Sequence, residues 1–197
     1  MPPSSSHIQS HLRHFLAAHP EDRDRLHQLV SFTKIAQGSL TNRKEFRGHV
    51  TVNAVLVNDH DECLMIRHIA LERWLTPGGH VESTDADLIA AALRELTEET
   101  GIPSAQVRLL SDTAIDIDVH RIPENLAKPE PSHLHFDFRF LFHTQHTQLV
   151  LQEDEVSAAE WRALHQLPNE RLHLRIRAAL RNNAVLNSKA SKPASIM

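Results

Sequence analysis

Three glutamates, Glu95, Glu98 and Glu99, lie near the end of a stretch with helical periodicity, residues 88–100. At spacings of three and four residues they share one helix face, where each like-charged pair destabilises a helix by roughly 0.2–0.5 kcal/mol. The C-terminal end of a helix also disfavours negative charge. A divalent cation would remove both penalties, and clustered carboxylates suit Mg²⁺ or Mn²⁺. On these residues alone, a solvated charged face is the simpler explanation.

The loop before this stretch favours the metal site over the solvated face. Gly78 and Gly79 are adjacent, so the backbone can turn sharply and bring a carbonyl or an N–H group close to a ligand. Arg94 lies four residues before Glu98 and can hold its carboxylate in position. A glycine loop, a helix and clustered carboxylates together predict a site for a charged ligand.

The helix that carries the glutamates has start and stop signals. Thr84 and Asp87 have the spacing of a capping box, with Asp where Glu or Gln is usual. Gly101 is well placed as the C-cap, and Pro103 prevents the helix from continuing. The stripe that faces the core consists of Leu88, Ala91, Ala92 and Leu96.

Strands are predicted on both sides of this helix. Runs of apolar and β-branched residues separated by turn residues are typical of strands. The run at 134–143 alternates, which places Phe136, Phe138, Phe140 and Phe142 on one face. Because strands and helices mix without regular alternation, we expect an α+β fold with a mixed sheet between helices. The expected strands cover 49–57, 63–67, 107–110, 114–119 and 134–143, and two further helices are expected over 157–165 and 168–186.

The N-terminal residues predict a helical hairpin over 7–36, because apolar residues recur there at helical spacing. Its apolar stripes could cover one side of the domain or pair with a second copy to form a homodimer, and the sequence leaves both open. The chain is therefore expected to have four parts. These are a flexible start (1–6), an N-terminal helical extension (7–46), one catalytic domain (47–186) and a disordered tail (187–197).

Composition limits the class of protein. With 41% apolar residues, a 197-residue chain can form a core, and its net charge of −4 argues against binding to a long nucleic acid. The one cysteine, Cys63, makes no internal disulfide and is expected to be a small apolar residue in a strand. We expect a cytoplasmic protein without a membrane partner, because no signal pattern or bilayer-length apolar run is present.

The stretch from Gly79 to Ile102 resembles the signature of the Nudix hydrolase family. That signature is Gly, five residues, Glu, seven residues, Arg-Glu, an aliphatic residue, any residue, Glu-Glu, any residue, Gly and an aliphatic residue. Residues 94–102, Arg-Glu-Leu-Thr-Glu-Glu-Thr-Gly-Ile, fit its second half. The first half departs, because Asp85 stands at the first acidic position and eight residues separate it from Arg94. Asp87 is the alternative for that position.

The resemblance covers roughly residues 48–168 and implies a MutT-like bacterial member with an α/β/α sandwich. It implies Mg²⁺-dependent (or Mn²⁺-dependent) cleavage of the diphosphate linkage in a nucleoside diphosphate derivative. A nucleoside triphosphate, ADP-ribose or a nucleotide sugar would be such a substrate. The implied metal ligands are Glu98 and Glu99, with Glu95 and the carbonyl of Gly79.

The chemistry of a diphosphate explains these roles. Cations neutralise the phosphate oxygens and lower the pKa of the attacking water. A carboxylate then takes the proton of that water. Glu95 is one candidate for this base, and Glu155 in the acidic loop 153–155 is another, with a solvated turn as the ordinary alternative for that loop. Arg94 would position the glutamates.

Substrate contacts are expected from His80, His135 and Trp74, although a surface histidine and a core tryptophan are ordinary alternatives. His135 shares a strand face with His133 and Asp137. Asp116, Asp118 and His120 share another strand face, where a second metal site is an alternative to an ordinary polar face.

Three other functions fit parts of the sequence. A catalytically silent Nudix-like module would bind a nucleotide without turnover, although all the carboxylates of the signature's second half are present. An isomerase of the same fold would need a specially placed cysteine, and only Cys63 is available. The 16 histidines invite a zinc-protein hypothesis, but their spacing does not match the usual zinc motifs.

Overall fold

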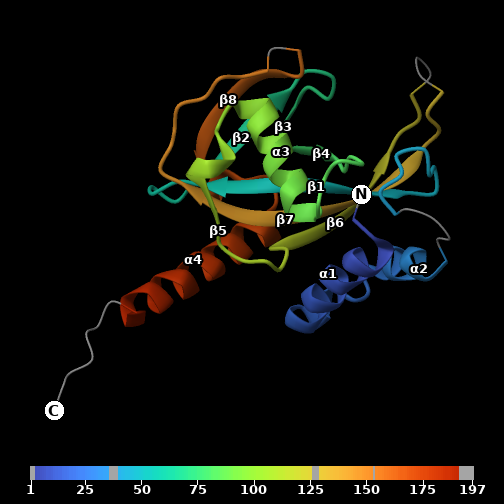
Figure 1. Ribbon diagram of the computed structural model, residues 1–197, viewed down its shortest axis with the longest axis horizontal. Helices are drawn as coiled ribbons and strands as arrows, with labels where there is room; N and C mark the ends of the chain where they lie inside the picture. The colour runs from blue at the N-terminus through green and yellow to red at the C-terminus, as the bar shows by residue number, and fades with distance from the viewer. Residues whose placement is uncertain (1–2, 36–39, 126–128, 153, 191–197) are drawn as a thin grey trace.

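The computed structural model describes residues 3–35, 40–125, 129–152 and 154–190 (Figure 1). Within these ranges eight strands form one mixed sheet in the order β3-β2-β1-β7-β5, with β4 paired to β1, β6 to β7 and β8 to β2. The strands are β1 (His49–Val57), β2 (Glu62–His68), β3 (Arg73–Leu75), β4 (Gly78–His80), β5 (Val107–Leu109), β6 (Asp116–Ile122), β7 (His133–Thr144) and β8 (Val156–Ala163).

The centre of the sheet is the parallel pair β1 and β7, aligned from His49↔His135 to Val57↔His143. Most of β1 is buried on both faces, as expected for a parallel strand between two helical layers. Phe136 and Phe138 are buried on one face of β7 together with Phe140 and Phe142, as the alternation predicted.

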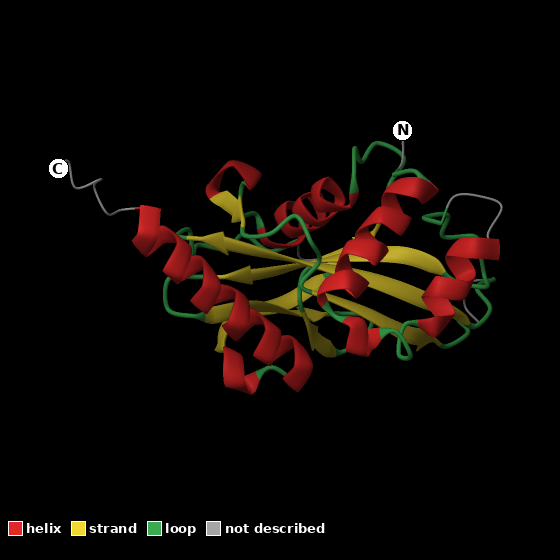
Figure 2. Cartoon of the chain, turned by 90° about the horizontal axis from the view of Figure 1, so that it is seen from below, coloured by secondary structure: helices red, strands yellow, loops and turns green. Residues whose placement is uncertain are grey.

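Helices cover both faces of this sheet. The helix α3 (Leu88–Thr100) packs into the core cluster that contains Val52 and Phe138, together with α1 (Ser5–Ala18) and α2 (His27–Ile35). The helix α4 (Glu170–Ala190) packs on the other face, against Val55 and Leu141. Figure 2 shows helices on both sides of the sheet. The predicted α+β fold with an α/β/α sandwich is therefore confirmed.

The bounds of α3 agree with those predicted, but its N-cap does not. Asp87 caps the helix, because its Oδ1 accepts a hydrogen bond from the Ala90 N–H at 2.7 Å. Thr84 lies in the preceding turn, so the predicted capping-box pair does not form. Gly101 is the C-cap as expected, with a φ of 70° in the left-handed region that favours glycine.

The prediction of a helix over residues 157–165 is wrong. These residues form β8, which pairs antiparallel with β2 from Glu62↔Ala163 to Arg67↔Ala158, followed by a 3-10 turn, Leu164–Gln166. The local sequence includes good helix formers such as Ala158 and Ala159, but pairing with the open edge of β2 satisfies the backbone hydrogen bonds and decides the outcome.

The N-terminal extension differs in detail from the prediction. The helix α1 begins at Ser5, where the Ser4 hydroxyl accepts a hydrogen bond from the His7 N–H. Pro20 opens a 3-10 turn rather than the second helix, and α2 starts at His27. At the other end, α4 continues to Ala190, so residues 187–190 of the predicted tail are helical. Residues 1–2, 36–39 and 191–197 lie outside the described part of the chain.

The apolar stripes of α1 and α2 are buried in the domain of the same chain. Ile8 and Phe15 are buried completely, and Phe32 lies 5.0 Å from Phe136 between ring centroids. The hairpin was predicted either to cover one side of the domain or to pair with a second copy, and in the structure it covers the domain (Figure 1). These stripes therefore no longer motivate a homodimer, which stays a prediction.

A buried ion-pair network joins this extension to the sheet and to α4. Asp116 has no exposed surface, and its carboxylate accepts hydrogen bonds from Arg139, Arg171 and Arg175. Arg175 also bonds Asp22 in the extension. Because guanidinium groups already occupy the oxygens of Asp116, this region is an ion-pair network, and the second metal site at Asp116, Asp118 and His120 does not form.

No helix in the described ranges is both long enough and apolar enough to cross a membrane.

Candidate active site

The glycine strand β4 lies directly against the glutamates of α3. The Gly78 N–H donates a hydrogen bond to Glu99 Oε2 at 2.9 Å. At Gly79 a Cβ atom would lie 2.6 Å from Glu95 Oε1 and 2.7 Å from Oε2. Only a residue without a side chain leaves room for the Glu95 carboxylate in this position, which is the reason for glycine at the start of the signature.

Arg94 holds the acidic groups together. Its Nε and Nη2 donate to the two oxygens of Asp85 at 3.0 and 3.1 Å, and Nη2 also donates to the His80 carbonyl at 2.9 Å. Nη1 donates to Glu98 Oε2 at 2.9 Å and to Glu95 Oε1 at 3.1 Å. The predicted pairing of Arg94 with Glu98 is present, and one guanidinium orients both the glycine strand and the helix face.

Asp85 occupies the first acidic position of the signature. It is buried, and besides Arg94 it accepts a hydrogen bond from the Glu82 N–H at 2.7 Å. Asp87, the alternative, is used as the helix cap. The extra residue falls in the turn between Asp85 and α3, so it leaves the register of the glutamates on the helix unchanged. The sequence signal for the role of Asp85 was its spacing from Gly79, with five residues between them.

Among the three glutamates, Glu99 is buried and Glu95 is half-buried, and the positive charge beside them is smaller than their negative charge. Glu99 is 2% exposed, whereas the Glu98 side chain is 51% exposed. Burial raises the pKa of Glu99 to about 8, although the Gly78 N–H bond opposes the shift. Burial likewise raises the pKa of Glu95 to about 7 against the effect of Arg94. Buried carboxylates with raised pKa values fit a divalent cation, which would supply the missing charge.

This electrostatics predicts how stability depends on pH. The pKa values of Glu95 and Glu99 rise from 4.5 to about 7 and about 8 on folding. The folded state therefore binds more protons, so these groups favour folding below pH 4.5 and lose that contribution as the pH rises towards 8.

A cation that binds the carboxylates of Glu95 and Glu99 should offset this loss of stability. We expect Mg²⁺ to raise the Tm more at pH 8 than at pH 6, measured against EDTA by calorimetry. An equal or smaller gain at pH 8 would contradict this.

The loop that carries Glu155 runs along the C-terminal end of α3. The Val150 N–H donates to the Thr100 carbonyl at 2.8 Å, and the Glu155 carbonyl accepts from the Ile69 N–H at 2.8 Å. The Glu155 side chain is exposed, and its charge helps to raise the pKa of both Glu95 and Glu99. Of the described residues in the predicted acidic loop, Glu155 is therefore the one whose negative charge acts on Glu95 and Glu99. Glu153 lies outside the described residues.

The three residues predicted to contact substrate lie apart from these carboxylates. His80 Nε2 lies 3.1 Å from His49 Nε2, and the rings of His80 and His135 are 5.3 Å apart. Trp74 is half-buried in β3, with the Arg162 guanidinium 4.1 Å from its ring centroid. The structure brings the rings of His80 and His135 together, although the His80 carbonyl contacts Arg94 of α3, and the role of both histidines as substrate contacts stays a prediction.

A further prediction concerns Gly79. Because the obstacle to a side chain there is the end of the Glu95 side chain, Gly79→Ala should fold but displace that carboxylate. A displacement of this order costs roughly 10- to 100-fold in kcat. Steady-state kinetics checks it, with far-UV circular dichroism to verify folding. A variant with the wild-type kcat would show that the position of Glu95 is not critical.

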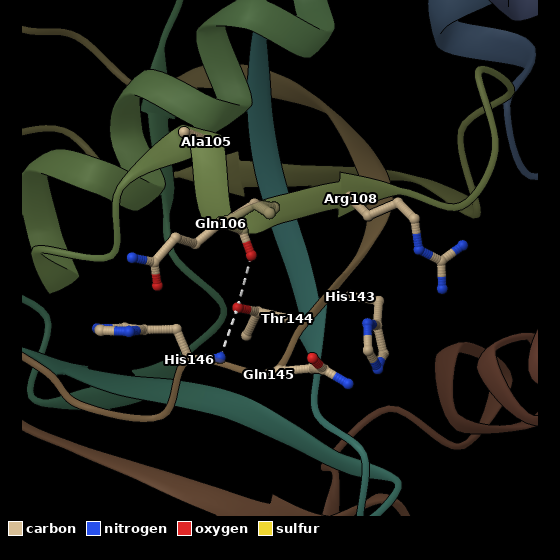
Figure 3. Close-up of a pocket in the computed structure, with 8 residues that line it drawn as sticks. Ala105, Gln106, Arg108, His143, Thr144, Gln145 and His146 are labelled. Carbon is tan, nitrogen blue, oxygen red and sulfur yellow. Dashed lines mark hydrogen bonds between the residues drawn. The ribbon is translucent and has the colours of Figure 1, made fainter.

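The pocket in Figure 3 is a separate surface feature. It is a hollow of about 540 Å³ between residues 105–108 and 143–146. The Thr144 hydroxyl donates to the Gln106 carbonyl at 2.8 Å, which joins the two walls. None of the α3 carboxylates lines this hollow, so its size does not make it the site of the chemistry.

The NUDIX domain family model matches residues 47–182 of this chain. The chain belongs to the Nudix family. The matched residues include both the glycine strand β4 and the glutamate helix α3. The predicted family and the predicted enzyme class, a Nudix-type pyrophosphohydrolase acting on phosphoric anhydrides, are therefore confirmed.

The chain is also similar to individual proteins, which differ in their identity to it and in how much of each chain is covered. A probable DHNTP pyrophosphohydrolase of Lactococcus lactis subsp. cremoris is 33% identical over 132 residues, which cover 64% of this chain and 72% of that protein. An m7GpppN-mRNA hydrolase of Xenopus laevis is 36% identical over 94 residues, but these cover 45% of this chain and only 30% of that protein. The solved E. coli dihydroneopterin triphosphate pyrophosphohydrolase has a TM-score of 0.51 at 21% identity, covering 68% of this chain and 95% of that one. The last comparison supports the Nudix fold alone.

Proposed function

We propose that this Nudix enzyme hydrolyses the diphosphate linkage of a nucleoside diphosphate derivative with Mg²⁺ as its cation, Mn²⁺ being the alternative. The observation that carries the proposal is the pair of buried carboxylates, Glu95 and Glu99, packed against the glycine strand with too little positive charge. Nudix enzymes generally use a divalent metal. An all-oxygen donor set favours Mg²⁺ or Mn²⁺ over softer metals.

We assign the roles as follows. Glu98 and Glu99 would hold the cation, and Glu95 and the Gly79 carbonyl would be its further protein ligands. When bound, the cation neutralises phosphate oxygens and makes the attacking water more acidic. Glu155, exposed at the edge of the site, takes the proton of that water, and Glu95 is the alternative base. Arg94 keeps Glu95 and Glu98 in place and does not touch the reacting atoms.

The substrate class follows from chemistry and from one relative. A site of carboxylates recognises a polyphosphate through its cation and leaves the rest of the substrate to other surfaces. The Lactococcus relative named a probable DHNTP pyrophosphohydrolase is similar to 64% of this chain. We therefore place dihydroneopterin triphosphate first among the candidates, ahead of purine nucleoside triphosphates, ADP-ribose and nucleotide sugars.

The test is a substrate panel with these four classes at fixed Mg²⁺, with products separated by chromatography. We expect one class to give cleavage at the diphosphate, and Glu98→Gln to lose most of that activity. Glu124→Gln, which changes an exposed glutamate far along the chain from α3, is the matched control and should behave as the wild type. If the wild type binds these compounds but cleaves none, the catalytically silent module replaces the proposal.

A further inference from the structure

Three histidines from two neighbouring strands converge at the start of the parallel pair. One ring nitrogen from each of His49, His133 and His135 lies within 4.8 Å of the other two. His49 in β1 is directly opposite His135 in β7, and His133 lies two residues before His135 on the same face of β7. Alternation along the strand predicted that His133 and His135 share a face, whereas the pairing of β1 with β7 brings His49 to them.

This cluster lies on the face of the sheet opposite α3. The Cβ direction of Gly79 points at the Glu95 carboxylate, and the next residue in a strand points to the other face. His80 accordingly meets His49 there, and Thr51, two residues after His49, bonds Asp137 on that face. The histidines therefore form a group separate from the glutamates, with the sheet between them.

The tautomers of two rings leave lone pairs directed into the cluster. His133 Nδ1 lies 2.8 Å from the Pro131 carbonyl, which can only accept, so Nδ1 carries the proton and Nε2 presents a lone pair towards His135 Nε2. His49 Nδ1 lies 3.5 Å from the Glu45 carbonyl in a longer contact of the same kind. Metal-binding histidines usually donate their second N–H to a carbonyl in this way.

The distances are close to those of a tetrahedral metal site. His133 Nε2 lies 3.3 Å from His135 Nε2. With Zn–N bonds near 2.0–2.1 Å, tetrahedral ligands are about 3.3 Å apart. The remaining separations, up to 4.8 Å, need only modest movement of the rings. Binding must also replace the contact between His49 Nε2 and His80 Nε2 at 3.1 Å.

Charge in this region both supports and opposes a cation. Burial lowers the pKa of His49 to about 4 and that of His135 to about 2, so both rings are neutral at pH 7 and need not lose a proton to bind metal. Arg43 is a neighbouring positive charge that works against a cation, but it is exposed and pairs with Glu130 at 3.5 Å.

We propose that His49, His133 and His135 bind one borderline transition-metal ion, for which Zn²⁺ is the probe, at a site distinct from the cation site on α3. Three imidazoles suit Zn²⁺, whereas Mg²⁺ prefers oxygen ligands. The ion would join β1 to β7 at the end where β4 also pairs with β1. Its role is to stabilise the central strands, because a ligand that binds only the folded state stabilises it.

The experiment is equilibrium dialysis of the full chain against micromolar Zn²⁺ with millimolar Mg²⁺ present, followed by metal analysis. The wild type should retain one Zn²⁺ per chain, and Co²⁺ in its place should give the visible absorption of tetrahedral nitrogen coordination. His133→Ala should bind Zn²⁺ at least about tenfold more weakly. Two controls, His60→Ala at an exposed position and Glu98→Gln on α3, should bind it as the wild type does.

Absence of Zn²⁺ from the wild type under these conditions would overturn the proposal, whether or not any variant folds. So would loss of Zn²⁺ in Glu98→Gln with retention in His133→Ala, because the ion would then sit at the glutamates. An equal loss in His60→Ala would indicate binding to scattered histidines. His135→Gln provides a second variant in case His133→Ala does not fold. All these readouts measure metal and not hydrolysis, so failure of the proposed enzymatic function leaves them interpretable.

Discussion

Glu99→Gln should lower kcat by about 10³-fold and should not destabilise the cation-free protein. Glutamine keeps the shape of the side chain and can still accept a hydrogen bond from the Gly78 N–H through its amide oxygen. It removes the negative charge that a cation needs. It also removes a carboxyl group whose pKa burial raises to about 8, so in EDTA the folded state loses an unfavourable charge.

Two measurements on purified Glu99→Gln check this prediction. Steady-state kinetics with saturating Mg²⁺ gives kcat, and calorimetry in EDTA at pH 8 gives the Tm. We expect the variant to have a Tm equal to or above that of the wild type, with the Glu124→Gln control unchanged in both. A variant that keeps its activity would remove Glu99 from the cation site, and a lower Tm in EDTA would contradict the account of its buried charge.

Asp116→Ala should destabilise the protein by about 3–5 kcal/mol, because removing one partner of a buried ion pair leaves the other charges uncompensated. The carboxylate is fully buried and bonds Arg139, Arg171 and Arg175 at once. Arg25 lies 3.5 Å away and also bonds Asp22. Loss of Asp116 therefore concentrates positive charge where the N-terminal extension, β7 and α4 meet.

Urea denaturation followed by circular dichroism measures this effect. Glu160→Ala is the matched control, since Glu160 pairs with Arg162 on the exposed edge strand β8, and an exposed pair contributes about 0–1 kcal/mol. If Asp116→Ala lowers the free energy of unfolding no more than Glu160→Ala does, the network does not hold the extension on the domain.

The sequence predicts best the features that depend on nearby residues. The bounds of α3 are set by its own caps and stripe, and Gly101 ends it wherever the rest of the chain lies. The glutamate face and the Arg94–Glu98 pair follow from helical spacing alone. These local rules identified the glutamates and the glycines, whose proximity the structure then gives.

The sequence did not predict the features that depend on which strands pair with each other. Residues 157–163 form a strand only because the edge of β2 is open to them. Likewise strand alternation turns the ring of His80 to the face opposite α3, beside His49, which its spacing along the chain did not predict, and its contact with substrate stays a prediction. Asp116, considered as a metal ligand, meets arginines that are 23 to 59 residues away in the chain.

The central claim is that the carboxylates of α3 act through a divalent cation to cleave a diphosphate. The most direct measurement is the turnover of the preferred substrate as Mg²⁺ is titrated into EDTA-treated wild-type protein, with pyrophosphate or monophosphate release as the readout. The account predicts no turnover above that of Glu98→Gln before Mg²⁺ is added, and a saturable recovery as it is added. Full turnover in EDTA, or a Glu98→Gln variant that recovers as well as the wild type, would contradict it.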